Sequence, residues 1–370
     1  MPKAFINSVL FTGKELLRDR ILIADNGRIS SVTYDKDLPS GVEVVDCRGN
    51  YLAPGLLDLQ IAGGGGYLFS SFPTKEALVS ITNDIVSTGT TGFLITLPTN
   101  TFEVYRKAFR AVKEFSHPAL LGIHLEGPFL SPAKKGAHLE ECIKVPHIDD
   151  VKALVDEAGG SIKMMTIAPE VCDPEIIGLL VSYGITVAAG HSNSTFWEAC
   201  AGFDNGIRTA THLFNAMSPL HHRDPGLPGA VFHSSEAYAS IIADGIHVDY
   251  NMVIIAKKIM GERLFLVSDA VEENLVDAYQ HVRRSDRFTL PDGTLSGSTL
   301  TMLSAVKNCV LNAGISFEEA LRMASAYPAR VMKYQDRGKI EPGFRADLIM
   351  FNDEFEIQEV FIDGNALKAK

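Results

Sequence analysis

The feature that most constrains the fold is an eightfold alternation of apolar, strand-length runs with segments of helical periodicity in the middle of the chain. The runs show no regular exchange of polar and apolar residues, which is typical of parallel strands buried on both faces. Eight strand–helix units predict an α/β fold, a (β/α)8 TIM-like barrel. The predicted strands are Leu56–Ile61, Gly92–Leu97, Leu120–Leu125, Ile162–Ile167, Ile185–Ala189, Ile207–His212, Ala239–Ala243 and Leu264–Val267.

Helical segments separate the predicted strands. The first, Thr74–Ser87, opens with a threonine that can cap a helix and has a glutamate soon after. An open, doubly wound sheet is the alternative fold, but no Gly-x-Gly-x-x-Gly fingerprint opens a helix in this chain. The other predicted helices are Phe102–Phe115, Asp149–Glu157, Pro174–Tyr183, Ser194–Phe203, Asn251–Gly261, Thr299–Asn312 and Phe317–Ala326.

Both ends of the chain have short β-like runs instead. Residues 20–32 are typical of a hairpin with Asn26-Gly27 at a type I′ turn, and Asp363-Gly364 is a second turn signal near the C-terminal end. Ala346–Phe351 and Glu359–Ile362 are the strands expected beside that second turn. We therefore expect a small β-sandwich domain built from residues 1–53 and 337–370, around a catalytic barrel of residues 54–336.

Net charge limits the partners that this chain can bind, and its cysteines indicate the compartment. The chain has 34 lysines and arginines against 45 aspartates and glutamates, a formal net charge of −11, so we expect no nucleic-acid or anionic-membrane partner. The five cysteines are scattered and form no Cys-x-x-Cys pair, which favours a reduced, cytoplasmic protein. No apolar run approaches the roughly 18 residues that a membrane span needs.

Four polar residues stand at the ends of predicted strands. Glu126, His191, His212 and Asp269 close the third, fifth, sixth and eighth apolar runs. Because active sites of such barrels gather at the carboxyl ends of the strands, these side chains are expected at one mouth. One carboxylate and two imidazoles leave a tetrahedral divalent ion with an open position, which predicts a hydrolytic metal site with Asp269 nearby to move protons.

Several segments add a resemblance to this interpretation. They are His124–Pro128, Gly190–Asn193, Thr211–Met217, Ala243–Asp249 and Leu295–Ser298. They resemble the N-acetylglucosamine-6-phosphate deacetylases of the amidohydrolase superfamily, and the resemblance covers essentially the whole chain. It implies hydrolysis of the N-acetyl group of N-acetylglucosamine 6-phosphate to glucosamine 6-phosphate and acetate, by a water that the ion activates.

One position departs from the wider superfamily. Many amidohydrolases carry His-x-His at the end of the first strand for a second metal, and the matching positions here are Gln60 and Ala62. The resemblance is therefore to the single-metal branch, with one divalent ion per subunit held by Glu126, His191 and His212. Zinc suits these ligands, and iron, cobalt, manganese and nickel stay open.

The resemblance also implies roles for other residues. Asp269 would act as general base and then acid, His138 would polarise the scissile carbonyl, and Arg223 would bind the substrate phosphate in the neighbouring subunit of a homodimer. The small molecule bound would be a phosphorylated amino sugar. Its further expected contacts are Gln60, which touches the ion or its water, and Ala137, Asn215, Ala216, His247, Leu295, Ser296 and Gly297.

Two other functions are alternatives for this sequence. A cyclic-amide hydrolase would resemble the binuclear enzymes, with His-x-His and a lysine after the fourth strand, yet that strand is followed by Ala168-Pro-Glu170. A catalytically inactive phosphosugar-binding protein is the alternative from a different class. It would have no need of Asp269 as a base.

Overall fold

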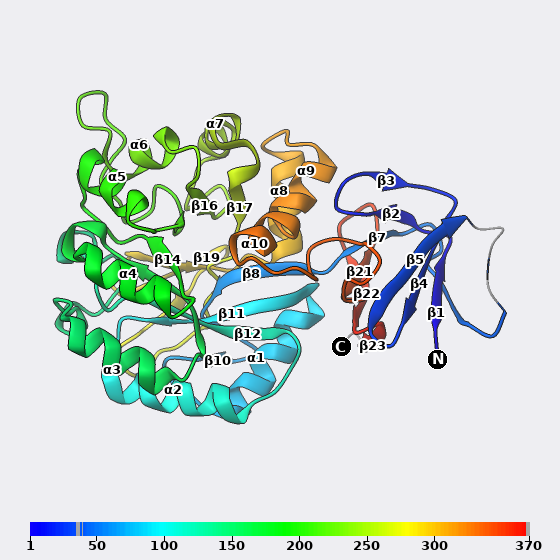
Figure 1. Cartoon of the computed structure of the whole chain (residues 1–370), viewed down its shortest axis with the longest axis horizontal. Coiled ribbons are helices and arrows are strands. Elements are labelled where there is room, and N and C mark those ends of the chain that lie inside the picture. The colour runs from blue at the N-terminus through cyan, green and yellow to red at the C-terminus, as the bar shows by residue number, and fades with distance from the viewer. Residues whose placement is uncertain (35–37, 39, 368–370) are drawn as a thin grey trace.

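The computed structural model describes residues 1–34, 38 and 40–367 and places a large α/β body beside a smaller all-β body (Figure 1). The first and last strands, β1 (Lys3–Ile6) and β23 (Asn365–Leu367), both lie in the smaller body. The predicted small domain also includes residues 35–37, 39 and 368–370, which lie outside the described residues.

The large body is built on one eight-stranded parallel sheet whose order is β17-β16-β15-β14-β13-β12-β11-β8. Spatial neighbours are consecutive along the chain and the order never reverses, unlike the order in a doubly wound sheet. A parallel bridge between Ile61 in β8 and Ala270, four residues after β17, joins the two ends of the sheet, and the predicted barrel is confirmed. The strands are β8 (Leu56–Ile61), β11 (Thr90–Pro98), β12 (Leu120–Glu126), β13 (Ile162–Ile167), β14 (Thr186–Ala189), β15 (Thr209–Ala210), β16 (Tyr238–Ile241) and β17 (Leu264–Leu266).

The later strands are shorter than the sequence predicts. The sequence predicts Ile207–His212 as one strand, but only Thr209 and Ala210 pair as β15. His212 has a φ of 34°, outside the extended region. The chain therefore leaves the ladder before the histidine, and the same bend places its side chain over the barrel end.

Helices surround the barrel. Thr74 caps the first through its hydroxyl, which accepts the N–H of Ala77 at 3.2 Å. The prediction missed α6, which begins Gly-Leu-Pro without a capping side chain. It also extended the helix that begins at Phe317 to Ala326, whereas α9 ends at Met323, and it missed the separate helix α10. The helices are α1 (Lys75–Ser87), α2 (Phe102–Glu114), α3 (Ile148–Ala158), α4 (Pro174–Ser182), α5 (Phe196–Asp204), α6 (Gly226–His233), α7 (Tyr250–Met260), α8 (Met302–Leu311), α9 (Phe317–Met323) and α10 (Ala326–Val331). None of the helices in the described ranges is long and apolar enough to cross a bilayer.

The smaller body contains two sheets, ordered β5-β4-β1-β6 and β23-β22-β21-β7-β2-β3. The two chain ends meet where β21 pairs antiparallel with β7, with Ile349 opposite Ala53. Phe5 and Phe361 pack edge to face at 4.9 Å in their shared core. The exact division at residues 53/54 and 336/337 stays a prediction. The strands not yet given are β2 (Val9–Phe11), β3 (Leu16–Leu17), β4 (Arg20–Asp25), β5 (Arg28–Tyr34), β6 (Glu43–Asp46), β7 (Tyr51–Pro54), β21 (Leu348–Phe351) and β22 (Ile357–Ile362).

A segment that the sequence did not predict lies between β17 and α8. Residues 271–298, here called the mouth segment, contain β18 (Val282–Arg283), β19 (Arg287–Thr289) and β20 (Leu295–Ser298). Asn274 donates a hydrogen bond to Ser71, just after the small hairpin of β9 (Gly63–Gly64) and β10 (Tyr67–Leu68). The mouth segment thus reaches from the eighth strand back to the loop after the first strand.

Candidate active site

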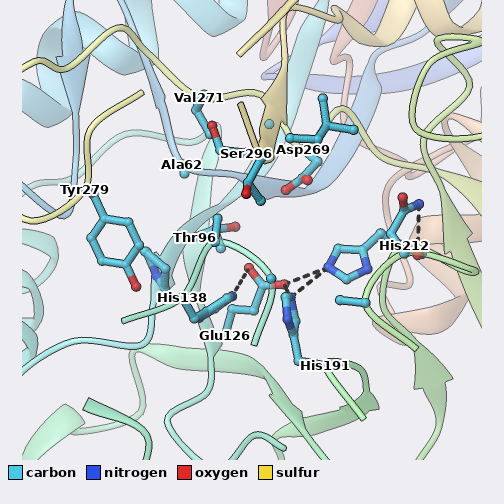
Figure 2. Close-up of a pocket in the computed structure, with 18 of the residues that line it drawn as sticks. Ala62, Thr96, Glu126, His138, His191, His212, Asp269, Val271, Tyr279 and Ser296 are labelled. Atoms are coloured by element: carbon cyan, nitrogen blue, oxygen red, sulfur yellow. Dashed lines mark hydrogen bonds and ion pairs between the residues drawn. The ribbon is translucent and has the colours of Figure 1, made fainter. Parts of the chain in front are cut away.

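Four side chains converge at the carboxyl ends of the barrel strands (Figure 2). Glu126 is the last residue of β12, and the other three stand two or three residues after their strands. His191, His212 and Asp269 have positive φ values of 47°, 34° and 52°. These left-handed positions are unusual for residues other than glycine and cluster at functional sites. They turn the chain at the strand ends, which lets all four side chains face one cavity.

The three predicted metal ligands lie together. His191 Nε2 and His212 Nε2 lie 3.2 and 3.0 Å from the same carboxylate oxygen, Glu126 Oε1, and 3.1 Å from each other. All three side chains are buried. These three residues form the only such cluster of potential ligands found among residues 1–34, 38 and 40–367.

The donor set fits a divalent cation. The Nδ1–H of His191 donates to the carbonyl oxygen of Lys134 at 3.0 Å, which leaves the Nε2 lone pair free to bind a metal. Two imidazole nitrogens and a carboxylate oxygen then point at one small volume. A cation would satisfy all three, because each can offer a lone pair to it.

Gln60 lies between the metal ligands and the predicted base. Its Nε2 donates to Glu126 Oε1 at 3.1 Å and to Asp269 Oδ1 at 2.9 Å. Its own Oε1 is buried and has no hydrogen-bond partner within the described part of the chain. An acceptor left open in this position is suited to a water or substrate group, and the substrate contact of Gln60 stays a prediction.

Burial and neighbouring charge give the carboxyl groups of Asp269 and Glu126 different pKa values. Burial raises the pKa of Asp269 to about 7, opposed by the charge of His212 and reinforced by that of Glu126. Burial would also raise the pKa of Glu126, but the neighbouring rings of His191 and His212 outweigh it and hold the pKa well below its usual range. The site therefore contains one carboxylate that stays charged and one that can exchange a proton near neutral pH.

His138 lies beside the cluster, and its proton position follows from a backbone contact. The N–H of Thr99 donates to His138 Nδ1 at 3.1 Å. Burial and the neighbouring His191 hold the pKa of His138 well below its usual range. A neutral ring that accepts at Nδ1 carries its proton on Nε2, which lies 3.7 Å from Glu126 Oε2. His138 thus presents an N–H donor.

A cavity of about 380 Å³ connects these groups. The four strand-end residues, His138 and part of the mouth segment line it. His247 faces it with a fixed ring, because its Nδ1–H donates to Asp244 Oδ2 at 2.6 Å. The predicted substrate residues that line it are Ala137, Asn215, Ala216, His247, Leu295, Ser296 and Gly297.

Gln60 touches two residues of the cavity wall, Glu126 and Asp269, without lining the cavity itself. Arg223 is the other predicted site residue that does not line it. It is exposed on the loop before α6. A role for Arg223 in a neighbouring subunit stays a prediction. Of the two nearby lysines, Lys134 lines the cavity and Lys135 pairs with Glu140 at 3.4 Å.

The prediction from the sequence did not include several residues that shape the site. Thr99 holds His138, and His281 lines the cavity with Nδ1 2.9 Å from Ser296 Oγ. Tyr279 also lines it. Thr99 follows a predicted strand end, so its position carried a usable signal. Tyr279 and His281 lie in a segment without periodicity, and nothing in the pattern marked them.

The comparisons with known proteins agree with this geometry. Residues 51–367 match the amidohydrolase family, and residues 4–52 match the NagA composite domain. The N-acetylglucosamine-6-phosphate deacetylase of Haemophilus influenzae is 35% identical over 379 residues, covering 98% of this chain and 99% of the relative. An N-acetylgalactosamine-6-phosphate deacetylase of a Shewanella species is 34% identical over 328 residues, covering 85% and 83%.

A solved structure is equally similar. The N-acetylglucosamine-6-phosphate deacetylase of Pasteurella multocida superposes with a TM-score of 0.95 at 34% identity, covering 99% of this chain and all of the other. A metal-ligand cluster at the mouth of a barrel and a full-length family match define the class of protein: the chain belongs to the amidohydrolase family. Its resemblance to the N-acetylglucosamine-6-phosphate deacetylases within that family is confirmed.

Proposed function

We propose that this protein hydrolyses the N-acetyl group of N-acetylglucosamine 6-phosphate, releasing acetate and glucosamine 6-phosphate. The observation that carries the proposal is the convergence of Glu126, His191 and His212 within reach of one cation, with Asp269 in the same buried cavity. A site for metal-assisted amide hydrolysis needs a cation, a proton carrier and room for a substrate. All three requirements have candidates in this cavity.

One divalent ion, zinc in our proposal, would be held by Glu126, His191 and His212. When bound, it supplies a Lewis acid that lowers the pKa of a water and polarises the acyl oxygen. The set of two imidazoles and a carboxylate also suits iron, cobalt, manganese and nickel. Metal analysis of the purified protein identifies the ion.

Asp269 would move the proton. As a carboxylate it accepts a proton from the attacking water, and as an acid it returns that proton to the departing amine, which leaves poorly without it. Burial favours the protonated form of Asp269 and the charge of a bound cation would favour its carboxylate, so opposing influences bring both halves of this cycle within reach. Gln60 fixes one oxygen of Asp269 by a hydrogen bond at 2.9 Å and so limits the orientations that the carboxyl group can take.

His138 would stabilise charge on the acyl oxygen. Its Nε2–H faces the same cavity as the metal ligands. A fixed donor at the position where negative charge develops lowers the barrier because it needs no reorganisation during the reaction. The backbone N–H of Thr99 is the group that fixes this donor.

The phosphate would be bound across a homodimer. Arg223 is exposed outside the cavity of its own subunit, and a guanidinium binds phosphate through two parallel hydrogen bonds. His247, held by Asp244, and the loop of Asn215 and Ala216 face the cavity of the same subunit. Leu295, Ser296 and Gly297 would line the acetyl end, beside Ala137 on the sugar side.

Complementation between subunits tests the dimer. Co-expression of Asp269→Asn and Arg223→Ala chains creates mixed dimers in which one of the two sites receives both an intact Asp269 and a partner's intact arginine. If Arg223 acts in the neighbouring site, random mixing restores about a quarter of wild-type activity at low substrate concentration. Activity no greater than that of the two variants assayed separately rejects the shared site.

Acetate release tests the function itself. The metal-loaded enzyme is assayed on N-acetylglucosamine with and without the 6-phosphate, on N-acetylgalactosamine 6-phosphate, and on a cyclic amide, each with and without a chelator. We expect chelator-sensitive release from N-acetylglucosamine 6-phosphate above all others. Preference for the galactose epimer, as in the name of the Shewanella relative, would reassign the sugar, and binding without release would favour an inactive phosphosugar-binding protein.

The five cysteines are all free thiols, four of them buried. Free thiols are typical of proteins in a reducing compartment. A cytoplasmic location is therefore part of the proposal, and cell fractionation checks it.

A further inference from the structure

The mouth segment contains a buried tyrosine, Tyr279, whose contacts have no role in the reaction proposed above. Tyr279 is 4% exposed. Its hydroxyl donates to the carbonyl oxygen of Thr99 at 2.5 Å and accepts the N–H of Leu139 at 3.4 Å. One phenol oxygen therefore joins three loops, those that follow the second, third and eighth strands of the barrel.

Two of these loops hold His138. The N–H of Thr99 donates to His138 Nδ1, while the carbonyl of the same residue accepts from Tyr279. Leu139 is the residue after His138. The phenol thus fixes the backbone on both sides of the contact between Thr99 and the histidine ring.

The contact with Thr99 decides which ring nitrogen carries the proton. If the N–H of Thr99 moved away, either nitrogen of a neutral imidazole could be protonated. With the N–H in place, Nδ1 must accept and Nε2 must donate. Only that tautomer presents a hydrogen-bond donor to the cavity at the place where the proposed reaction develops negative charge.

We propose that Tyr279 is a positioning residue for His138, tying the loops that fix this ring as an Nε2–H donor. The inference rests on the proposed role of His138 in amide hydrolysis. Asn274 supports Tyr279 in turn, because its side-chain N–H group donates to the carbonyl oxygen of Tyr279 at 2.6 Å and to that of Val276 at 2.7 Å.

Tyr279 also lines the cavity, so a direct contact with substrate is the competing explanation. The two explanations differ in what happens when His138 is absent. A residue that acts through His138 loses its influence in a His138→Ala background, whereas a residue that touches substrate keeps it. A double-mutant cycle measures this difference.

The experiment compares Tyr279→Phe in wild-type and His138→Ala backgrounds, using the full-length, metal-loaded enzyme and N-acetylglucosamine 6-phosphate. We expect kcat to fall about tenfold or more in the wild-type background, as for one lost buried hydrogen bond, with KM within about twofold. In the His138→Ala background the further loss should be less than about twofold. An equal loss in both backgrounds, or no loss in the first, overturns the proposal.

A spectroscopic measurement makes the test independent of the reaction. Nitrogen-15 shifts of the His138 ring, identified by their absence in His138→Ala, should show an Nε2–H tautomer in the wild type and a mixture in Tyr279→Phe. If the wild type hydrolyses no N-acetylated sugar phosphate, the function fails while these shifts still decide the contact. An unchanged tautomer in Tyr279→Phe overturns the positioning role.

Two further variants control for folding. Tyr327→Phe removes another buried phenol hydroxyl, one that bonds Glu319 instead of the site, and should leave kcat within about twofold. Asn274→Ala keeps the Tyr279 hydroxyl but loosens its segment. If Tyr279→Phe does not fold, Asn274→Ala must give a smaller loss in the same direction that disappears in the His138→Ala background, and its failure to do so rejects the proposal.

Discussion

The strand ends and the loops above them contribute to one cavity but are held in place by different means. Glu126 and Asp269 stand on the barrel, where ladder hydrogen bonds fix the backbone; the N–H of Asp269, for example, donates to the carbonyl oxygen of Gln60 at 2.9 Å. His138 and Tyr279 stand on loops that have no ladder. Their positions depend on single contacts between loops, such as those made by Thr99.

The difference shows how tasks are divided in this fold. Side chains that must meet a metal ion come from the rigid frame, where small displacements are costly. The side chains that we propose to contact substrate come from loops, which can differ between relatives without disturbing the barrel. One strand-end side chain nevertheless depends on a loop, because the carbonyl oxygen of Lys134 orients the ring of His191.

The largest loss of activity should follow removal of a metal ligand at a strand end. His212→Ala removes one of three ligands, so bound metal should fall below stoichiometric and kcat should drop by about 10³-fold, since several kcal/mol of charge stabilisation are lost. Metal analysis and acetate release check this. The exposed His233→Ala serves as the matched control and should retain metal, and full metal content in His212→Ala would contradict the proposed ligand set.

The second-largest loss of activity is expected at Asp269, the proposed proton carrier. Asp269→Asn keeps the shape of the side chain and an oxygen for Gln60 but cannot accept the proton, so kcat should fall by about 10² to 10⁴-fold while substrate still binds. Rapid kinetics and equilibrium binding of the substrate separate the two quantities. Asp277→Asn, an exposed change in the mouth segment, should have no effect. Near-normal turnover in Asp269→Asn would remove this residue from the mechanism.

A loop residue should affect binding more than turnover. Arg223→Ala should raise KM about tenfold to a hundredfold with little change in kcat, because it removes charge-assisted hydrogen bonds to a group remote from the reacting bond. Steady-state kinetics measure both constants. Lys135→Ala, which removes a cation already paired with Glu140, should stay within about twofold, and equal effects of the two changes would argue against a specific phosphate contact.

The smallest effect concerns stability in acid. Burial lowers the pKa of His281 in the mouth segment to about 4, against a usual value of 6.5. Between these values the unfolded chain binds more protons than the folded one, so stability is complete above about pH 6.5 and falls as the pH drops toward 4. His281→Gln should reduce this acid-induced loss by about 2 kcal/mol. Urea unfolding at pH 7 and pH 4.5 measures it, with the exposed His233→Gln as control.

Individual residues show which parts of the site and fold can be predicted from the sequence. Glu126, His191, His212 and Asp269 each follow an apolar run, and the barrel then brings equivalent strand ends to one mouth. The mouth segment could not be found in the same way, because its strands β18 and β19 have only two and three residues. The boundary of α9 was also missed, since apolar residues continue past Met323 into α10 and hide the break.

The sequence by itself determined the eight-unit barrel and the residue types at the strand ends, because burial on both faces of a parallel sheet leaves a pattern along the chain. It also marked both chain ends as β-rich, but the structure decided that they pair, with β21 beside β7. The tertiary structure alone decided that Thr99 meets His138 and Tyr279, which lie 39 and 180 residues away. Such contacts use backbone N–H and carbonyl groups that every residue other than proline offers. They leave no trace in the order of side chains, so only the folded chain can show which of them form.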